Sequence, residues 1–332
     1  SERMAVETCE ECRFDAGAYT RDDAKGTLRA TGIRWRWTIE DVDPRLLHRR
    51  PAPAVWSIVE YVDHSATVIE LMGRLLHAMT TRDVEPMEGL DAPGASAGDP
   101  PTTLSIDDAL HRLGANVARL DAKARSLRGE DWARTVIVDG ETRTADDVLR
   151  HAVHDSTHHL MDGGRVLAAL GARTPEIDTG VVAGLFANKG GVGKLPIPEA
   201  SIGYRGVVGD RQRTRFHHGR VSQALCLWSA EVVRALGAEG HPIEAGSAGE
   251  NISIQGITWT DVRAGTRLGI GADALIEVSG YALPCKNNSS FFIDGDFRRM
   301  DPDRHPGWSR IYASVLRDGV VRPGDKVVIE PG

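Results

Sequence analysis

The 332-residue chain contains only four cysteines, no excess of positive charge and no hydrophobic run of transmembrane length. Four cysteines are too few for a disulfide scaffold in a chain of this size, so we expect a reducing compartment. No positively charged leader precedes an apolar stretch, and we therefore predict a cytoplasmic protein without a membrane partner. The formal net charge of −7 at pH 7 argues against nucleic acid as the main partner. Small molecules remain as the expected partners, and the composition leaves the oligomeric state open.

The two halves of the chain differ in their hydrophobic periodicity, and the chain is long enough for two domains. Between residues 53 and 170, apolar side chains recur at helical spacing. After residue 171, short β-branched runs alternate with glycine pairs, which is typical of a compact, mostly β domain such as a barrel. We predict an α+β multidomain protein with a helical domain over residues 1–175 and a β-barrel domain over residues 176–332.

Three segments of the first half have the pattern of amphipathic helices. One spans residues 53–79, a second begins behind Ser105 with a capping signal at Asp108, and a third spans 144–170 behind a variant of the capping box. Residues 136–140 end in Asp-Gly, which predicts a tight hairpin turn. The first half is therefore expected to be a helical bundle.

The third helix carries two histidines, His154 and His158, at a spacing of four residues. Residues four apart lie on one face of a helix, and two imidazoles on one face form half of a site for zinc, iron, nickel or copper. A solvated, histidine-rich helix face would give the same pattern. His64, in the first predicted helix, is a candidate third ligand, and His151 competes with it because it lies one turn before His154. Spacing alone does not choose between them.

The cysteines differ in their surroundings. Cys285 follows a predicted strand and stands beside a lysine among polar residues, which favours an exposed, reactive thiol. Cys226 lies in an apolar run and is expected to be buried. Cys9 and Cys12 form one Cys-x-x-Cys pair, and without a second pair nearby it is weak support for zinc or for a redox motif.

A glycine-rich stretch over residues 188–194 imitates a phosphate-binding P-loop. That loop requires Ser or Thr after its lysine and a helix whose N-terminus faces the phosphates. Here Leu195 follows the lysine, and Pro196 and Pro198 prevent a helix from continuing. ATP hydrolysis is therefore not expected, although Lys189 and the second lysine of the loop could bind another anion.

Basic side chains are concentrated over residues 205–220, where guanidinium groups could hold a carboxylate or a phosphate. A solvated basic loop would explain the pattern equally well. A polar turn at Glu250 and Asn251 could line the same pocket. The basic residues are Arg205, Arg211, Arg213, Arg215, His217, His218 and Arg220.

Residues 9–170 resemble the DinB-like four-helix family, which includes thiol-dependent S-transferases and relatives of maleylpyruvate isomerase. The resemblance rests on Cys-Glu-Glu-Cys-Arg-Phe-Asp from Cys9, on the segment from Arg50 to His64 and on His-Asp-Ser-Thr-His-His from His154. It implies a divalent metal held by His64, His154 and His158, and it ranks His151 and His159 below them. Zinc is the expected metal, with iron or nickel as alternatives.

Residues 179–332 resemble a MOSC domain, the β-rich module at the C-terminus of molybdenum-cofactor sulfurases. The resemblance rests on Lys189-Gly-Gly-x-x-Lys-Leu-Pro, Gly206-x-x-Gly-Asp-Arg-Gln, His217-His-Gly, Gly249-Glu-Asn-Ile, Leu283-Pro-Cys and Gly324-Asp. It implies that Cys285 carries sulfur as a persulfide. The chain lacks the N-terminal barrel and the aminotransferase-like half that accompany MOSC in such proteins, which counts against a molybdopterin cofactor while leaving it as an alternative.

The two resemblances together predict a metal-dependent sulfur-transfer enzyme that uses a low-molecular-weight thiol as cosubstrate. A metal in the helical half would hold the thiol as a thiolate. Cys285 would accept or release sulfur, while Arg211, Arg215 and His217 would hold an anionic group of the substrate. The alternatives are a C–S lyase or thiol-dependent isomerase that uses the MOSC half for recognition, and a molybdopterin-binding or sulfur-carrier protein with a structural metal.

Overall fold

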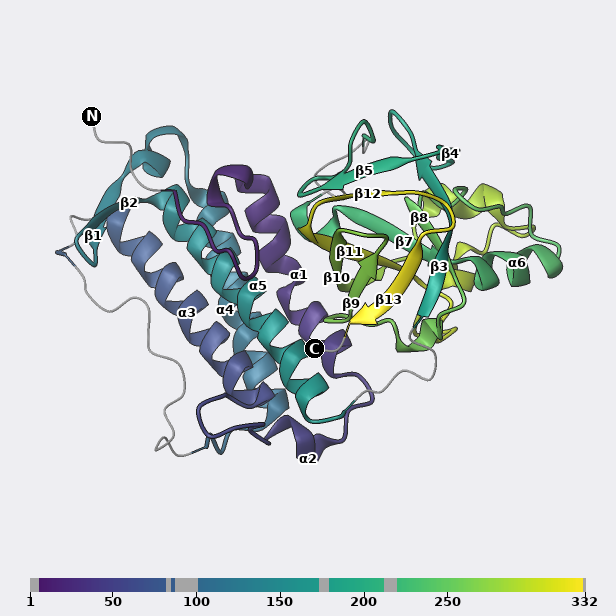
Figure 1. The fold of residues 1–332 in the computed structure, drawn as a ribbon. Helices are drawn as coiled ribbons and strands as arrows, with labels where there is room; N and C mark the ends of the chain where they lie inside the picture. Colours follow the sequence, from purple (N-terminus) through teal and green to yellow (C-terminus); the bar gives the residue numbers. More distant parts are fainter. Residues whose placement is uncertain (1–5, 82–84, 87–100, 173–178, 212–219, 331–332) are drawn as a thin grey trace. The chain divides into compact units, whose positions relative to one another are not determined.

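The computed structural model describes residues 6–81, 85–86, 101–172, 179–211 and 220–330. The chain divides into two compact units, Ser1–Ala172 and Arg173–Gly332. The first is a helical bundle and the second contains a β-barrel (Figure 1), which confirms the predicted fold class. The expected boundary between residues 175 and 176 lies outside the described residues. Among the described residues, none of the helices has the length and hydrophobicity that a membrane-spanning segment requires.

The bundle consists of four long helices: α1 (Arg21–Ile39), α3 (Ile58–Met79), α4 (Ile106–Ser126) and α5 (Ala145–Ala169). Helix α3 packs against α4 and α5, and α1 packs against the other side of the same two helices. The shorter elements of this unit are η1 (Ala16–Ala18), α2 (Pro44–Leu47), η2 (Gly129–Ala133), β1 (Thr135–Val138) and β2 (Glu141–Thr144).

The starts of the helices follow from side-chain caps. The hydroxyl groups of Ser57, Ser105 and Thr144 accept hydrogen bonds from backbone N–H groups of the first turns of α3, α4 and α5. The predicted caps at Ser105 and Thr144 are thus confirmed, whereas the first helix begins at Ile58 rather than near residue 53. The predicted Asp-Gly turn joins β1 to β2, and both turn residues have positive φ, as a type I′ turn requires.

The centre of the bundle includes the fully buried side chains of Trp35, Leu28, Ile69, Met72 and Leu149. Trp35 of α1 lies directly on Gly163 of α5, where a Cβ atom would come within 2.6 Å of the indole ring. Glycine at this position therefore lets α1 approach α5 closely. Because Gly163 must face Trp35, this contact also sets the rotation of α5 about its own axis.

The barrel closes because β13 pairs with both β9 and β3, giving the ring β13-β9-β10-β11-β7-β8-β3. Neighbouring strands of the ring are antiparallel except for β7 and β8, which are parallel. The ring strands are β3 (Thr179–Ala187), β7 (Leu225–Ser229), β8 (Ile252–Gln255), β9 (Arg267–Ile270), β10 (Ala274–Ala282), β11 (Arg310–Arg317) and β13 (Lys326–Glu330).

Smaller elements complete the second unit. Strand β4 (Leu195–Pro196) extends the barrel sheet beside β3, and β12 (Gly319–Val321), β5 (Ala200–Gly203) and β6 (Gly206–Val207) form a separate sheet. The helical elements are α6 (Ala230–Ala238), η3 (Val221–Gln223), η4 (Trp259–Asp261), η5 (Lys286–Phe291) and η6 (Phe297–Met300). The stretch that imitates a P-loop connects β3 to β4, and no helix follows it.

Candidate metal sites on helix α5

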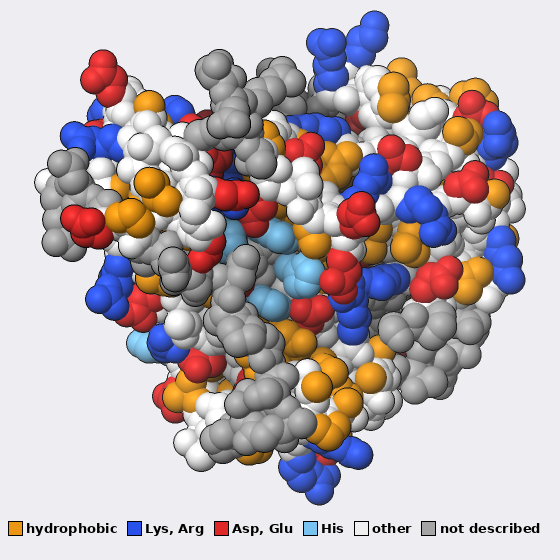
Figure 2. All heavy atoms as spheres, turned by 60° about the vertical axis from the view of Figure 1, so that its left-hand side comes forward, with side chains coloured by type: hydrophobic (Ala, Val, Ile, Leu, Met, Phe, Trp, Pro, Cys, Tyr) orange, Lys and Arg blue, Asp and Glu red, His pale blue; other side chains and the backbone are white. Residues whose placement is uncertain are grey.

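Helix α5 gathers five side chains that could ligate a metal along one side of the bundle. Its histidines lie on the floor of a cavity of about 560 Å³, formed by α5, the β1–β2 hairpin and the N-terminal segment. Figure 2 shows histidine side chains in the middle of this face with acidic side chains around them. The five residues are His151, His154, Asp155, His158 and His159.

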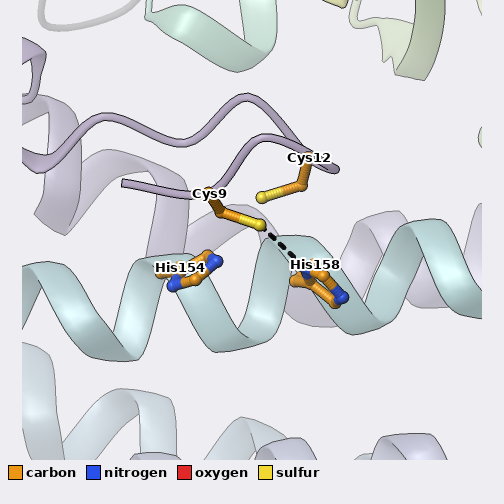
Figure 3. Close-up of side chains that lie close together, drawn as sticks. All are labelled: Cys9, Cys12, His154 and His158. Atoms are coloured by element: carbon orange, nitrogen blue, oxygen red, sulfur yellow. Dashed lines mark hydrogen bonds between the residues drawn. The ribbon is translucent and has the colours of Figure 1, made fainter. Parts of the chain in front are cut away.

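The first group combines His154 and His158 of α5 with the two N-terminal cysteines (Figure 3). Ligand atoms of Cys9, Cys12, His154 and His158, the Cys2His2 group, all lie within 4.8 Å of one another. The Cys9 sulfur lies 3.6 Å from Nδ1 of His158. The cysteines belong to a turn that is closed by an isolated β-bridge between Thr8 and Asp15, so the fold of the segment itself directs both sulfurs toward α5.

Carboxylates hold the other nitrogen of each histidine in this group. Nδ1 of His154 donates to Glu7 at 2.6 Å, and Glu7 also accepts from His151 at 2.9 Å. Nε2 of His158 lies 3.5 Å from Glu11 and 3.6 Å from Asp162. Nε2 of His154 is buried and has no hydrogen-bond partner in the described part of the chain.

The ionisable side chains around the Cys2His2 group shift one another's pKa values. Burial opposes the charge of His154, but its interactions with Cys12 and Glu7 outweigh burial and raise the pKa of His154 to about 11. Burial likewise opposes ionisation of Glu7, yet its bonds with His151 and His154 lower its pKa to about 2. Burial raises the pKa of the Cys12 thiol. Burial also raises the pKa of the Cys9 thiol, but hydrogen bonds from backbone amides and the interaction with His154 prevail and lower it.

The second group lies one residue further along α5 and faces α3. Oδ2 of Asp155 lies 3.2 Å from Nε2 of His64 and 3.3 Å from Nε2 of His159. These three residues, the His2Asp group, also have their ligand atoms within 4.8 Å of one another. Oδ1 of Asp155 is buried without a hydrogen-bond partner in the described part of the chain. On the other side of its ring, Nδ1 of His159 donates to Asp162 at 2.9 Å.

Aromatic rings and burial set the environment of the His2Asp group. The ring of Trp56 lies 4.7 Å from that of His64, and the ring of Tyr61 lies 5.3 Å from that of His159. Burial raises the pKa of Tyr61 to about 12. Burial opposes the charge of Asp155, but its bonds with His159 and His64 hold its pKa well below the usual range. For His159, burial lowers the pKa, while the bonds with Asp155 and Asp162 dominate and raise it to about 9.

The structure divides the predicted triad between these two groups. His154 and His158 lie with the cysteines, whereas His64 lies with Asp155 and with His159, which ranked lower by the family resemblance. No group of ligand atoms among the described residues unites His64 with His154 and His158. Asp155 is not among the ligands predicted from the sequence, and the Cys-x-x-Cys pair gave only weak support for zinc, because no second cysteine pair and no histidine pair is near it in the sequence. Cys-x-x-Cys combined with His-x3-His is a zinc ligand set, and this combination was the signal that could have revealed the first group.

In the second unit, Cys285 follows β10 and is half-buried, directly before η5. Cys226 is buried, as predicted. Asn288, three residues after Cys285, is fully buried, and neither atom of its side-chain amide has a hydrogen-bond partner in the described residues. This amide is a polar feature near Cys285 that is not among the residues predicted from the sequence.

The predicted anion-binding residues of the second unit have different environments. Lys189 and Arg211 are exposed, while Glu250 and Asn251 are buried. Glu250 accepts a hydrogen bond from the backbone N–H of Gly246 at 2.5 Å. Asn251 donates to Asp210 at 3.0 Å. The last two are therefore part of the packing between loops, and Arg215, His217 and His218 lie outside the described residues.

Asp210 links the loops that carry several of these residues. Lys194 forms an ion pair with Asp210 at 2.7 Å, and both side chains are nearly buried. The backbone N–H of Asn188 donates to the same carboxylate at 2.8 Å. The glycine-rich loop, the start of the basic segment and the Asn251 turn are thus joined around one buried carboxylate.

Comparison with known proteins finds one domain family in each unit. Residues 27–161 match the DinB superfamily and residues 214–328 match the MOSC domain. YiiM from Geobacillus stearothermophilus is 24% identical, with a TM-score of 0.36 over 46% of this chain and 75% of that chain. YfiT from Bacillus subtilis, described as a probable metal-dependent hydrolase with an unusual four-helix bundle topology, is 16% identical, with a TM-score of 0.38 over 46% of this chain and 87% of that chain. A search of curated proteins found no match.

Proposed function

We propose that this chain, a DinB superfamily domain followed by a MOSC domain, is a metal-dependent enzyme that transfers thiols or sulfur. The observation that carries the proposal is the His2Asp group, an open ligand set at the edge of a cavity of about 560 Å³. Asp155 and His159 line this cavity, and His64 joins them from α3. A small substrate in the cavity would thus lie beside the metal ligands.

The donor set fits a catalytic divalent cation. Two imidazoles and one carboxylate leave coordination positions open, as in catalytic zinc sites and in non-haem iron sites. The buried, unpartnered Oδ1 of Asp155 is the kind of atom that a cation would satisfy. A cation bound there would supply the positive charge that keeps a bound thiol as a thiolate.

The surrounding side chains hold these ligands in place. Asp162 accepts from His159 and so fixes which nitrogen of that ring faces Asp155. Glu60 accepts hydrogen bonds from Arg50 at 2.9 Å and from the backbone of Ser57 at 2.8 Å, which fixes the first turn of α3, just before His64. The ligands therefore sit on rigid elements, as a catalytic site requires.

The rings of Trp56 and Tyr61 lie against the two imidazoles of the group and limit the access of water to them. The hydroxyl group of Tyr61, whose pKa burial raises to about 12, is protonated at neutral pH and can donate a hydrogen bond. Tyr61 could in this way orient a substrate oxygen without changing charge.

In the second unit, Cys285 is the proposed sulfur acceptor. Its thiolate would attack the outer sulfur of a low-molecular-weight persulfide, forming a cysteine persulfide and releasing the donor as a thiolate. The half-buried position of Cys285 allows such an approach. The exposed Lys189 and Arg211, together with Arg215, His217 and His218, are the proposed contacts for an anionic group.

Turnover of an electrophilic substrate by the purified full chain, with and without added thiol, tests the proposal. We expect activity to require both metal and thiol, and His159→Gln to reduce kcat/KM at least 100-fold, on the order expected when a catalytic metal is lost. His111→Gln, on the exposed surface of α4, is the matched control and should retain full activity. Unchanged turnover by the His159 variant would contradict the metal assignment, and turnover without thiol would indicate metal-dependent hydrolysis instead.

Cys285 is tested separately by mass spectrometry after incubation with a low-molecular-weight persulfide. We expect one additional sulfur on Cys285 and none on the Cys285→Ser protein. Full sulfur transfer by the serine variant would remove this cysteine from the reaction.

A further inference from the structure

We propose that the Cys2His2 group is a second metal site, a closed Zn²⁺ site that fastens the N-terminal segment to α5. It is separate from the proposed catalytic group, because the two share no ligand. The inference therefore does not depend on whether the proposed activity is correct.

The donor atoms and their spacing suit zinc. Two thiolates and two imidazoles form a complete tetrahedral set, which is typical of structural zinc and leaves no position for a substrate. With Zn–S near 2.3 Å and Zn–N near 2.0–2.1 Å, neighbouring ligand atoms of a tetrahedral ion lie about 3.4–3.8 Å apart. The Cys9 sulfur and Nδ1 of His158 are 3.6 Å apart, and the whole set falls within 4.8 Å. Small side-chain rotations would close the remaining difference.

The outer contacts orient both histidines for a metal. With Nδ1 of His154 donating to Glu7, the deprotonated ring has its lone pair on Nε2, the atom that would bind the ion. This Nε2 is buried without a hydrogen-bond partner in the described residues. His158 turns its Nδ1 toward Cys9 and its Nε2 toward Glu11 and Asp162. A carboxylate behind each imidazole is the usual arrangement around metal-bound histidine.

The cysteine turn has the backbone of a metal-binding loop. The N–H of Cys9 donates to the carbonyl of Phe14 at 2.9 Å, and backbone amides of Glu11 and Cys12 donate to the Cys9 sulfur. Arg13 has a φ of 61°, a conformation that costs a non-glycine residue on the order of 1 kcal/mol. Amides directed at sulfur stabilise a thiolate, and a bound ion would offset the backbone strain.

The site would shape one wall of the cavity. Glu7 and Thr8, which precede Cys9, line the cavity together with Asp155 and His159. Asp162 contacts His159 at 2.9 Å and His158 at 3.6 Å, so one carboxylate connects the two groups. A structural zinc would therefore hold the segment that closes the cavity on one side, without itself taking part in the reaction.

Cobalt substitution separates the two sites by spectroscopy. The chelated full chain, reloaded with Co²⁺, should show the sulfur-to-cobalt charge-transfer absorption of a thiolate site. Cys9→Ser/Cys12→Ser should lose this absorption and one equivalent of metal, whereas His159→Gln should keep the absorption. Cys285→Ser is the matched control, because it removes a cysteine of the other unit and should keep the absorption. Absence of the absorption from the loaded wild-type chain, or its survival in the double serine variant, would overturn the proposal.

Alkylation of the wild-type chain tests the site without any variant. Cys9 should resist an alkylating reagent in the zinc-loaded chain and react once a chelator is added, whereas half-buried Cys285 should react equally in both states. Equal reactivity of Cys9 in the two states would contradict the proposal. So would a Cys9–Cys12 disulfide in protein purified under reducing conditions, because an oxidised pair cannot supply two thiolates.

Discussion

The two ligand groups each take two residues from α5 at the same spacing, but the two pairs have different surroundings. His154 and His158 form one pair four residues apart, and Asp155 and His159 form the next, displaced by a single residue. One residue turns a helix by about 100°, so the pairs face different neighbours. The first meets two cysteines from the N-terminal segment, and the second meets His64 of α3. The Cys2His2 group therefore has soft sulfur ligands and a complete tetrahedral set, which suits a structural ion. The His2Asp group has harder nitrogen and oxygen ligands and leaves coordination positions open, which suits catalysis.

Removing the sulfur ligands should have the largest effect on stability. We expect Cys9→Ser/Cys12→Ser to lower the free energy of unfolding of the helical unit by about 4 kcal/mol, the stabilisation that a ligand gives at about 1,000 times its Kd. Chemical denaturation followed by far-ultraviolet circular dichroism measures the change, and Cys285→Ser is the control. If chelator leaves the wild-type transition in place, the site has no structural role.

Neutralising the carboxylate of the open group should affect activity far more than stability. In Asp155→Asn, the two imidazoles lose their shared negative partner, and we expect kcat/KM to fall about 100-fold as metal is lost from this group. The Cys2His2 group should keep its equivalent of zinc, measured by elemental analysis. Asp107→Asn, on the exposed first turn of α4, is the matched control. Loss of both metals from the Asp155 variant would show that the two groups are not independent.

Glu60 provides a pH test that concerns the His2Asp group alone, because it fixes the first turn of α3, the helix that carries His64. Burial raises the pKa of Glu60, but its bonds with Arg50 and Ser57 prevail and lower it to about 2 from 4.5. Its contribution is therefore complete above about pH 4.5 and is lost as the pH falls toward 2. We expect Glu60→Gln to cost about 2 kcal/mol of unfolding free energy at pH 7, as for a lost charged hydrogen bond. Denaturation at a series of pH values should show this difference shrinking in acid, and a constant difference would count against the ion pair.

Asp162 should give the smallest effect, because it contacts the ligands rather than a metal. We expect Asp162→Asn to weaken metal binding at the His2Asp group about tenfold, the lower end of the range for such outer carboxylates. The Cys2His2 group should be weakened less, since its contact with Asp162 is 3.6 Å rather than 2.9 Å. Competition with a chelator measures both affinities. Equal loss at the two groups would mean that Asp162 supports them alike.

Much of the bundle follows from local sequence patterns. Helices α3, α4 and α5 have regular apolar stripes, and capping side chains at Ser105 and Thr144 mark two of their starts. Helix α1 has no comparable stripe, because it buries polar and small residues such as Thr27, Thr31 and Gly26 beside Trp35. Its place in the bundle depends on the close contact with Gly163, which no local pattern reveals.

The division of the candidate ligands between two groups likewise depends on tertiary contacts rather than on a local sequence pattern. Helical spacing placed His154 and His158 on one face, and the structure agrees with that placement. The family resemblance assigned His64 to this pair as the third ligand. In the structure, His64 lies instead beside Asp155 and His159, each of which is one residue further along α5 than a member of the pair. Such a shift is only about 100° of helix rotation, and it changes every neighbour of the ligands.

By itself, the sequence determined which residue types are present, where α4 and α5 begin and that two histidines of α5 share a face. Only the tertiary structure decided which partners each face meets. The reason is that metal binding needs ligand atoms within a few ångströms of one point, whereas Cys9 and His158 are 149 residues apart in the chain. The bundle packing that rotates α5, together with the N-terminal turn that crosses it, brings those residues together.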